Sequence, residues 1–216
     1  MYSRTCGGGG ISSTFGAALW VLDYTLQSLV VGVQALNFHH GTVGNSPYDW
    51  WGALLNTTTN TTFTPYTFAP YYGAVFASAA LAGGDTVAML DDGTTPYAAY
   101  AVYDKHGKPL RVVLYNSVYY NGTAKRSHHV FTLEGLEGTS LTAVRLTSAA
   151  ATDKVETSQT PSVAGLQFDD VTCAVKGHPV VETVKVKDGV ANVHVKASQA
   201  VLVELMDRGV QWNGNW

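Results

Sequence analysis

A change of hydrophobic periodicity near residue 85 constrains the fold of this chain more than any other feature of its sequence. Upstream of it, apolar residues recur at helical spacing, and from about Thr86 they alternate with a period of two, as in half-buried strands. The alternating part predicts seven short strands, at 98–103, 110–117, 128–133, 141–147, 180–187, 190–196 and 200–206. Seven short strands separated by turn signals are typical of an antiparallel β-sandwich.

Two of the connections between these strands read as tight hairpins. The segment 187–190 contains Asp188-Gly189, a pair that readily takes the positive φ angles of a two-residue turn. The segment 104–108, with Gly107, is a second hairpin candidate. The adjacent acidic residues Asp91-Asp92 and Asp169-Asp170 are interpreted as turn residues, because neighbours on a strand point to opposite faces and cannot act as an acid/base couple.

The first 85 residues predict helices with a short strand between them. Ser12 or Ser13 is the expected N-cap of a helix that ends before Gly32, and 71–81 is a second apolar helix. Between them, 33–39 reads as a short buried strand. Because such a strand needs neighbours on both sides, we interpret residues 1–85 as the end of a larger barrel or sheet.

Composition and length exclude several classes of protein. The chain has 216 residues, fewer than the roughly 250 of a complete (β/α)8 barrel. Charged residues make up 13%, the net charge is −3 and no basic stripe is visible, so no nucleic-acid partner is expected. No continuous apolar stretch reaches the roughly 18 residues of a membrane span, so no membrane partner is expected either.

The two cysteines give no metal site. Cys6 and Cys173 are too few for a disulfide framework, and no Cys/His spacing resembles that of a zinc site. No metal and no cofactor are therefore expected, and whether the two cysteines are bonded stays open.

Three glycosylation sequons begin at Asn56, Asn60 and Asn121. They indicate a secreted protein, yet the opening residues lack the apolar segment of a signal peptide. Either the start of the protein is missing, or the sequons are accidental in a chain rich in Asn and Thr. The first interpretation is favoured.

A glycine-rich opening followed by an apolar helix resembles glycoside hydrolase family 79, which holds β-glucuronidases and heparanases. The segments that carry the resemblance are Tyr-Ser-Arg-Thr-Cys-Gly-Gly-Gly-Gly at 2–10 and Ser-Thr-Phe-Gly-Ala-Ala-Leu-Trp-Val-Leu-Asp at 13–23. Shorter segments at 37–42, 48–52 and 69–73 fit the fungal members. The rest of the chain, to about Asp207, resembles the C-terminal β-domain of the family.

The resemblance implies a (β/α)8 barrel with a β-sandwich packed on it. The expected fold class is therefore α+β, with residues 1–85 as a remnant of the last βα units of the barrel, 86–208 as the antiparallel β-sandwich and 209–216 as a tail. Family members are retaining hydrolases with two catalytic glutamates. In the register of the resemblance Met1 occupies the position of the nucleophile, and the acid/base lies upstream of this chain.

That register predicts a chain without catalytic residues of its own. Retaining hydrolysis needs two carboxyl groups about 5–5.5 Å apart, one to protonate the leaving oxygen and one to attack the anomeric carbon. A methionine thioether can do neither, so the chain alone is expected to be inactive.

The resemblance also assigns substrate-binding residues. Gly7 and Gly8 match family glycines whose backbone N–H groups receive the substrate carboxylate, and Tyr48 matches a tyrosine that bonds the same group. The alternatives are a flexible glycine-rich loop and a tyrosine that packs on a neighbouring tryptophan. His39 and His40 lie where a barrel site would open, but a structural role for them is favoured, and His128-His129 is read as surface.

The sequence thus predicts the C-terminal part of a secreted, retaining β-glucuronidase-like hydrolase. The parent protein would act on a glycan containing glucuronic acid, and a missing N-terminal barrel or a partner would cover residues 1–85. The alternative is a non-catalytic module, a β-sandwich that binds carbohydrate or has a structural role.

Overall fold

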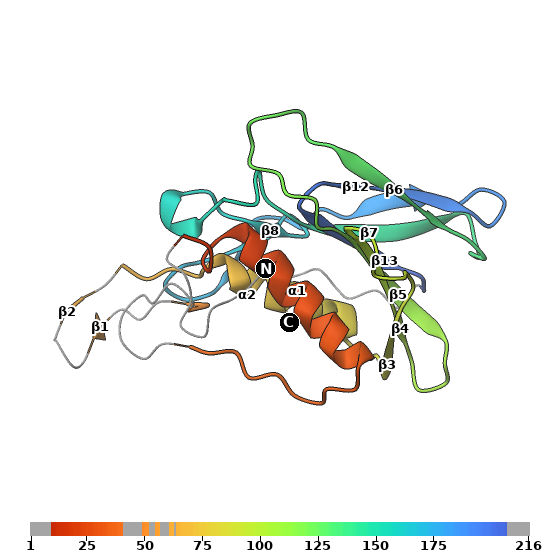
Figure 1. The fold of residues 1–216 in the computed structure, drawn as a ribbon, viewed down its shortest axis with the longest axis horizontal. Coiled ribbons are helices and arrows are strands. Elements are labelled where there is room, and N and C mark those ends of the chain that lie inside the picture. The colour runs from red at the N-terminus through yellow and green to blue at the C-terminus, as the bar shows by residue number, and fades with distance from the viewer. Residues whose placement is uncertain (1–9, 41–48, 52–54, 57–60, 63, 207–216) are drawn as a thin grey trace.

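The computed structural model describes residues 10–40, 49–51, 55–56, 61–62 and 64–206. It shows a small α+β fold with two helices and antiparallel sheets (Figure 1). The helices are α1 (Phe15–Val30) and α2 (Ala69–Leu81), and a 3₁₀ turn, η1, covers Val155–Thr157. The strands are β1 (Leu55–Asn56), β2 (Thr61–Thr62), β3 (Thr86–Met89), β4 (Tyr97–Tyr103), β5 (Pro109–Asn116), β6 (His128–Leu133), β7 (Ser140–Thr147), β8 (Ser162–Val163), β9 (Gln167–Phe168), β10 (Val175–Lys176), β11 (Glu182–Lys185), β12 (Ala191–Lys196) and β13 (Gln199–Glu204).

The main sheet has the strand order β11-β7-β13-β5-β4-β3, with β8 paired to β7. All of its pairings are antiparallel. The last strand of the chain, β13, lies in the middle of this sheet and is buried along its whole length. The order of the strands in the sheet therefore differs from their order in the sequence, and β13 completes the core.

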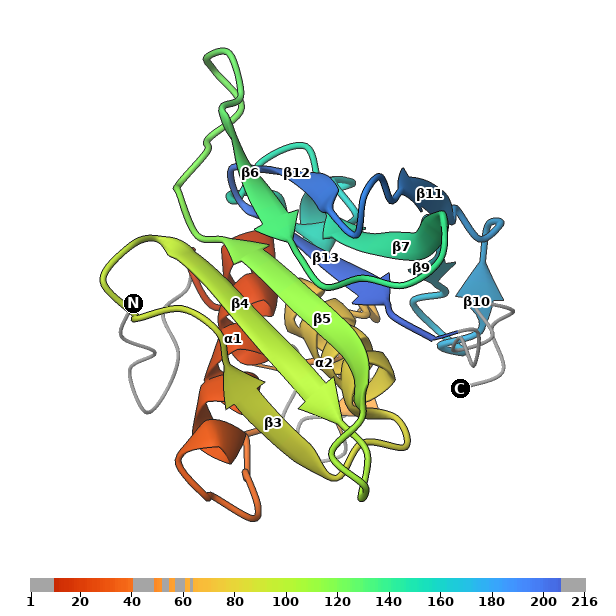
Figure 2. The same ribbon diagram turned by 90° about the vertical axis from the view of Figure 1, so that its right-hand side faces the viewer.

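Both helices cover one face of the main sheet, as Figure 2 shows for the part formed by β3, β4 and β5. The core between them combines helix residues with strand residues. Its fully or almost fully buried members include Phe15, Leu22, Leu26, Tyr72, Phe76, Tyr100, Val113, Leu146 and Leu202. Residues on both sides of position 85 thus share one core, and the predicted division at that position stays a prediction.

A second β layer, formed by β6 and β12, covers the opposite face of the main sheet. In β12 the residues Ala191, Val193 and Val195 are buried, whereas those between and after them are exposed. The turn that leads into β12 has φ angles of 54° at Asp188 and 75° at Gly189, as the sequence predicts. It carries the chain from β11 in the main sheet to the second layer.

Two predictions for the N-terminal part are wrong. Residues 33–39 form no strand, and most of them are exposed. The N-cap of α1 is Thr14, not Ser12 or Ser13, and its side chain caps nothing. Backbone carbonyls of the 151–153 loop take that role, since the N–H of Phe15 donates to the carbonyl of Asp153 and that of Gly16 to the carbonyl of Ala151, both at 2.8 Å.

The α1 C-terminus follows the prediction. Val31 is the C-cap and Gly32 follows it with a φ of 84°, the left-handed conformation in which glycine costs least. Neither helix is long enough to span a bilayer, and the part of the chain that the structure describes contains no candidate span.

Candidate functional site

The residues predicted to bind the substrate carboxylate, Gly7, Gly8 and Tyr48, lie outside the described residues. Of the chain that flanks them, residues 10–14 lead into α1, and His40 and Asp49 stand on either side of the segment 41–48. The structure therefore describes the surroundings of the predicted site.

His40 and Asp49 bring the two ends of that segment together. The Nδ1 atom of His40 lies 3.6 Å from Oδ1 of Asp49, whose side chain is 1% exposed. The His40 ring also packs on Trp51 at a centroid distance of 4.4 Å. These contacts give His40 a structural place beside a buried carboxylate, whereas His39 is exposed.

Aromatic side chains from α1 and the segments at 38 and 50 form one cluster beside this pair. Trp20 stacks on Tyr24 at 5.1 Å, Phe38 meets Trp20 edge-on at 6.0 Å, and Phe38 lies 4.9 Å from Trp50. Tyr24 is 45% exposed. Large aromatic side chains at a surface are characteristic of contact sites, because they bury much area with few rotatable bonds.

A network of polar contacts fixes the loop that packs under α2. The backbone N–H of Thr67 donates to Oδ1 of Asp170 at 2.8 Å, and the N–H of Phe168 donates to the Tyr72 hydroxyl at 3.2 Å. Burial raises the pKa of Tyr72 to about 12, so its hydroxyl stays protonated. Asp169 accepts three hydrogen bonds from Val171 and Thr172, which confirms it as a turn residue.

A partly buried polar contact ties α1 to β4. The Tyr100 hydroxyl donates to Oδ1 of Asp23 at 2.5 Å, and Nε2 of Gln27 donates to the Tyr100 oxygen at 2.8 Å. Burial raises the pKa of the Asp23 carboxyl, and the hydrogen bond from Tyr100 opposes that shift. The contact is structural, because the Asp23 carboxyl points into the contact between helix and sheet.

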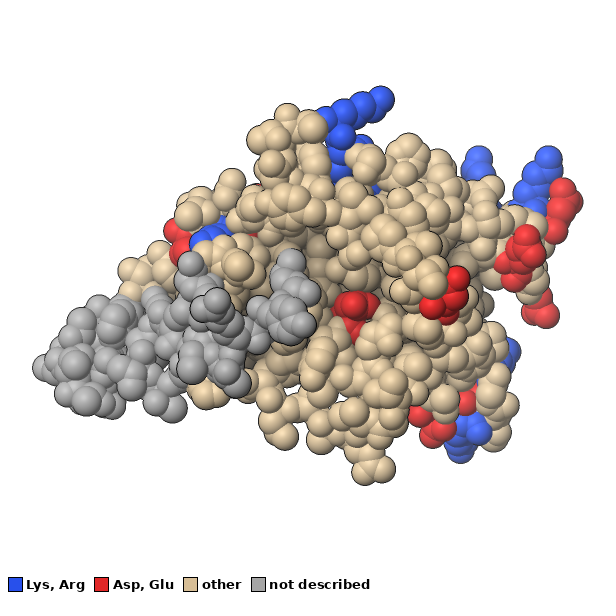
Figure 3. Space-filling model, in the orientation of Figure 1, with Lys and Arg blue, Asp and Glu red and all other residues tan. Residues whose placement is uncertain are grey.

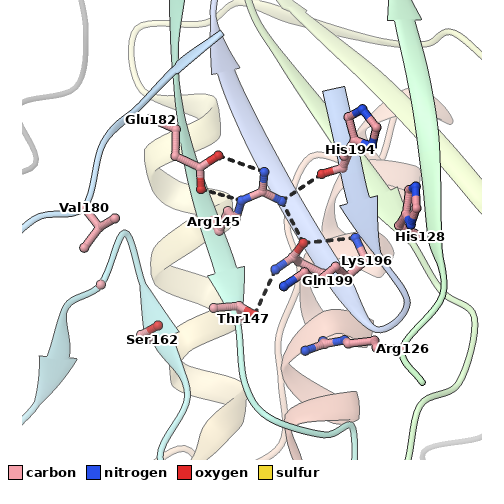
Figure 4. Close-up of a pocket in the computed structure, with 11 residues that line it drawn as sticks. Arg126, His128, Arg145, Thr147, Ser162, Val180, Glu182, His194, Lys196 and Gln199 are labelled. Atoms are coloured by element: carbon pink, nitrogen blue, oxygen red, sulfur yellow. Dashed lines mark hydrogen bonds and ion pairs between the residues drawn. The ribbon is translucent and has the colours of Figure 1, made fainter. Parts of the chain in front are cut away.

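A groove of about 650 Å³ opens on the side of the main sheet away from the helices. It lies between β7 and β11 of that sheet and β12 of the second layer (Figure 4). Its lining residues are Arg126, His128, Arg145, Thr147, Ser162, Gly165, Val180, Glu182, His194, Lys196 and Gln199.

Arg145 forms the floor of the groove and joins the two β layers. Its guanidinium binds both oxygens of Glu182, at 2.5 and 2.8 Å, and also donates to the backbone carbonyl of His194 and to Oε1 of Gln199. This pairing lowers the pKa of the Glu182 carboxyl. Sequence reasoning missed Arg145, since only the alternation of β7 hints that its side chain shares a face with Ala143 and Thr147.

Arg126 supports the lower end of the groove. Its three nitrogens donate to the backbone carbonyls of Ala197, Ser148 and Ser198 at 2.8–2.9 Å, and its guanidinium lies 5.1 Å from the Tyr120 ring centroid. Backbone carbonyls hold the side chain in place without cancelling its charge. Burial lowers the pKa of the Arg126 guanidinium, and the nearby Tyr120 and Asp153 oppose that shift.

The remaining predictions about sites concern metals and glycans. No group of three or more possible metal ligands exists among the residues that the structure describes. Asn121 is exposed in a turn in which Thr123 donates to its Oδ1 from both N–H and hydroxyl. Asn56 lies in β1, and Asn60 is outside the described residues.

The fold is shared with a solved structure of low sequence identity. It is similar to a family 51 arabinofuranosidase from Xanthomonas axonopodis pv. citri, with a TM-score of 0.53 over 89% of this chain and 36% of that one, at 14% identity. Residues 99–202 match the family described as "Glycosyl hydrolase family 79 C-terminal beta domain". Residues 99–202 therefore correspond to the C-terminal β domain of glycoside hydrolase family 79, which confirms the resemblance seen in the sequence.

Two relatives make the likeness more specific. A 4-O-α-L-rhamnosyl-β-D-glucuronidase from Fusarium oxysporum 12S, solved with Rha-GlcA, is 47% identical, with a TM-score of 0.84 over 92% of this chain. A β-glucuronidase of Neurospora crassa is 38% identical over 130 residues. The chain spans 40% of the Fusarium enzyme, and the match covers 22% of the Neurospora enzyme.

Proposed function

We propose that this chain is the C-terminal part of a secreted, retaining β-glucuronidase-like hydrolase and that it lacks both catalytic glutamates. The chain would hold the substrate carboxylate and brace the barrel, while the barrel breaks the glycosidic bond. The relatives named as glucuronidases support this proposal, and each of them is much longer than the matched segment.

The observation that carries the proposal is the lack of charge on the helical part. Across residues 10–40 and 64–84, Asp23 is the only Asp, Glu, Lys or Arg. Figure 3 shows few charged side chains on the face of the molecule that includes α1. A helical surface that faces water normally carries charged residues, so we assign this face to a contact with another part of the protein.

Large apolar side chains exposed on the helical part also support a contact with another part of the protein. Ile11, Tyr24, Val31 and Trp51 are between 45% and 74% exposed. Contiguous apolar patches mark interaction sites. The occupant we propose is the (β/α)8 barrel of the same protein, because the Neurospora and Fusarium enzymes are far longer than the segment that matches this chain.

Within this arrangement the backbone N–H groups of Gly7 and Gly8 would receive the uronate carboxylate. Residues without side chains let the backbone approach an anion closely, and successive N–H groups form a nest for it. Tyr48 would donate its hydroxyl to the same group. The carbonyls that cap α1 and the His40–Asp49 pair support this role, since they fix the chain close to both segments.

The chemistry divides between the two parts. Bond cleavage needs a proton donor and a carboxylate nucleophile about 5–5.5 Å apart. In the register of the resemblance Met1 stands at the nucleophile position, so this chain would contribute binding and orientation of the substrate and neither proton transfer nor attack.

The test is a chimera in which residues 2–216 of this chain replace the matching part of the Fusarium enzyme, with both catalytic glutamates of that enzyme retained. We expect the chimera to hydrolyse an aryl β-D-glucuronide and the isolated chain to give no turnover. In the chimera, Gly8→Val should raise KM, because its side chain blocks the approach of the carboxylate, whereas Ser3→Ala should leave KM unchanged. Turnover by the isolated chain, or a folded chimera without activity, would refute the proposal.

Secretion is tested separately through the sequons. We expect enzymatic removal of N-glycans to lower the mass of the native protein, and Asn121→Gln to remove one glycan. A native protein whose mass does not change on this treatment would contradict a secreted glycoprotein.

A further inference from the structure

The residues that line the groove of Figure 4 carry a net positive charge, whereas the whole chain carries a net negative charge. The whole chain has 13 basic and 16 acidic residues, whereas three basic residues and one acidic residue line the groove. The single carboxylate, Glu182, is already bound by Arg145. Among the described residues neither Arg126 nor Lys196 forms an ion pair within 4.0 Å, although Asp153 and Glu182 act on them at longer range.

Lys196 is the side chain best placed to meet a ligand. It lies exposed on the outward face of β12, directly opposite His128 in the register with β6. Among the described residues its ammonium has no carboxylate partner within 4.0 Å. The rings of His128 and His194 lie 5.1 Å apart on the same side of the groove.

The opposite wall has a different character. Figure 4 shows Ser162 and Val180 across the groove from Lys196 and His128, with Thr147 between them. Hydroxyl groups and a short apolar side chain can meet the hydroxyls and the C–H face of a sugar ring. The volume of about 650 Å³ falls within the roughly 300–1,000 Å³ of ligand pockets and far exceeds the needs of a simple ion.

We propose that this groove binds an acidic oligosaccharide, with the carboxylate of a uronic acid residue at Lys196. The choice of a uronic acid as the anion rests on the proposed function, whereas the charge and shape of the groove do not. Its lining residues all lie between 126 and 199, far along the sequence from the predicted cradle at Gly7 and Gly8. It also lies on the sheet face away from the helices, so a barrel on the helical side would leave it open.

The role of each wall follows from how firmly its residues are held. Arg145 and Gln199 are engaged with each other and with the backbone, so they keep the floor rigid and are not free to follow a ligand. Lys196 is exposed, and Arg126 adds a positive charge that backbone carbonyls hold in place. A carboxylate is attracted by both, whereas Asp153 and the paired Glu182 oppose it.

The experiment is calorimetric titration of the 216-residue chain at low ionic strength. The probe is a tetrasaccharide of alternating glucuronate and N-acetylglucosamine, compared with its carboxyl-reduced, neutral form and with sodium sulfate. We expect binding of the acidic tetrasaccharide that weakens with salt, and none of the neutral one. Binding of both forms with equal affinity, of sulfate alone, or of none of the three would overturn the proposal.

Variants locate the site. Lys196→Ala should weaken binding by about tenfold or more, the effect of losing a hydrogen bond between charged groups. Lys196→Arg should retain binding, and the control Lys105→Ala, in the exposed hairpin of 104–108, should not change it. Equal affinities of the two alanine variants, with unchanged thermal unfolding, would place any binding elsewhere and overturn the assignment.

The outcome is distinct from that of the chimera. An active chimera whose chain fails to bind the tetrasaccharide would refute the groove alone. An inactive chimera with binding intact would refute the proposed hydrolase and leave the groove as a carbohydrate-binding site.

Discussion

Gly73 lies where α2 meets the backbone of α1. A Cβ atom at this position would stand 2.1 Å from the carbonyl oxygen of Ala18, so the helices could not keep their present separation. Gly73→Ala should lower the free energy of unfolding by about 1–3 kcal/mol, the usual cost of overpacking. Urea unfolding measures this, with Ser78→Ala on the exposed side of α2 as the control that should change it by less than about 0.5 kcal/mol.

An unfolding free energy of Gly73→Ala equal to that of the unmodified chain would contradict the close contact between the helices. Replacing Gly73 with any other small residue would also cause this clash, because the Cβ atom would meet the backbone of Ala18 and not the end of a flexible side chain.

The raised pKa of Asp23 predicts a pH dependence of stability. Above the folded-state pKa the buried carboxylate is charged, and its burial costs stability. As the pH falls through that raised pKa toward the ordinary value of 3.8, the cost disappears. Relative to Asp23→Asn, the unmodified chain should therefore gain unfolding free energy as the pH falls through this window.

Asp92→Asn is the control for this measurement, because hydrogen bonds from Thr94 lower the pKa of Asp92. Its contribution has the opposite sign, present above 3.8 and lost as the pH falls through the lowered value. Parallel pH profiles for the two variants would contradict the account of Asp23.

At the scale of elements, an ion pair within the main sheet also holds the end of α2 through hydrogen bonds. Arg111 of β5 binds Glu204 of β13 at 2.9 Å, both side chains are about 6–7% exposed, and Arg111 also donates to the carbonyls of Ala80 and Ala82. Glu204→Ala would leave a buried guanidinium without its counter-charge and should cost about 3–5 kcal/mol of unfolding free energy.

The control for this prediction is Glu182→Ala, in the more exposed pair with Arg145, whose partner keeps two further acceptors. It should cost clearly less than Glu204→Ala. A loss of equal size in both variants, measured by urea unfolding, would show that burial does not set the strength of these pairs.

The element boundaries show how much of the fold is readable from the sequence. All seven predicted strands are present, within about three residues at either end, because alternation and turn residues act locally. The four-residue β3 was missed, since it is too short to establish a period. Helix α2 starts at Ala69, two residues before the prediction, because Pro70 is tolerated in the first turn.

What the sequence could not supply is the assembly of distant segments. The groove takes its lining from β6, β7, β11, β12 and the residues around 162–165, and nothing local predicts that these strands face one another across two layers. The carbonyl caps of α1 come from residues about 137 positions away for the same reason. The predicted cradle at Gly7, Gly8 and Tyr48 came from family resemblance, and it stays a prediction.

At the scale of the whole molecule, the two sides of the main sheet have different roles in our account. The helical side is almost without charge and is assigned to the barrel, whereas the side with the second β layer carries the basic groove and is assigned to solvent. Because the helices and the sheet share one core, a barrel bound to the helices would be held in a fixed place relative to the β domain.

The most direct test of the central claim is the intact mass of the native protein, captured with an antibody to the β domain and freed of N-glycans. Our account predicts a mass of roughly 50–60 kDa, the size of a barrel with a sandwich attached. A native protein of 23.0 kDa, the mass of this chain, that is stable without a partner would contradict it.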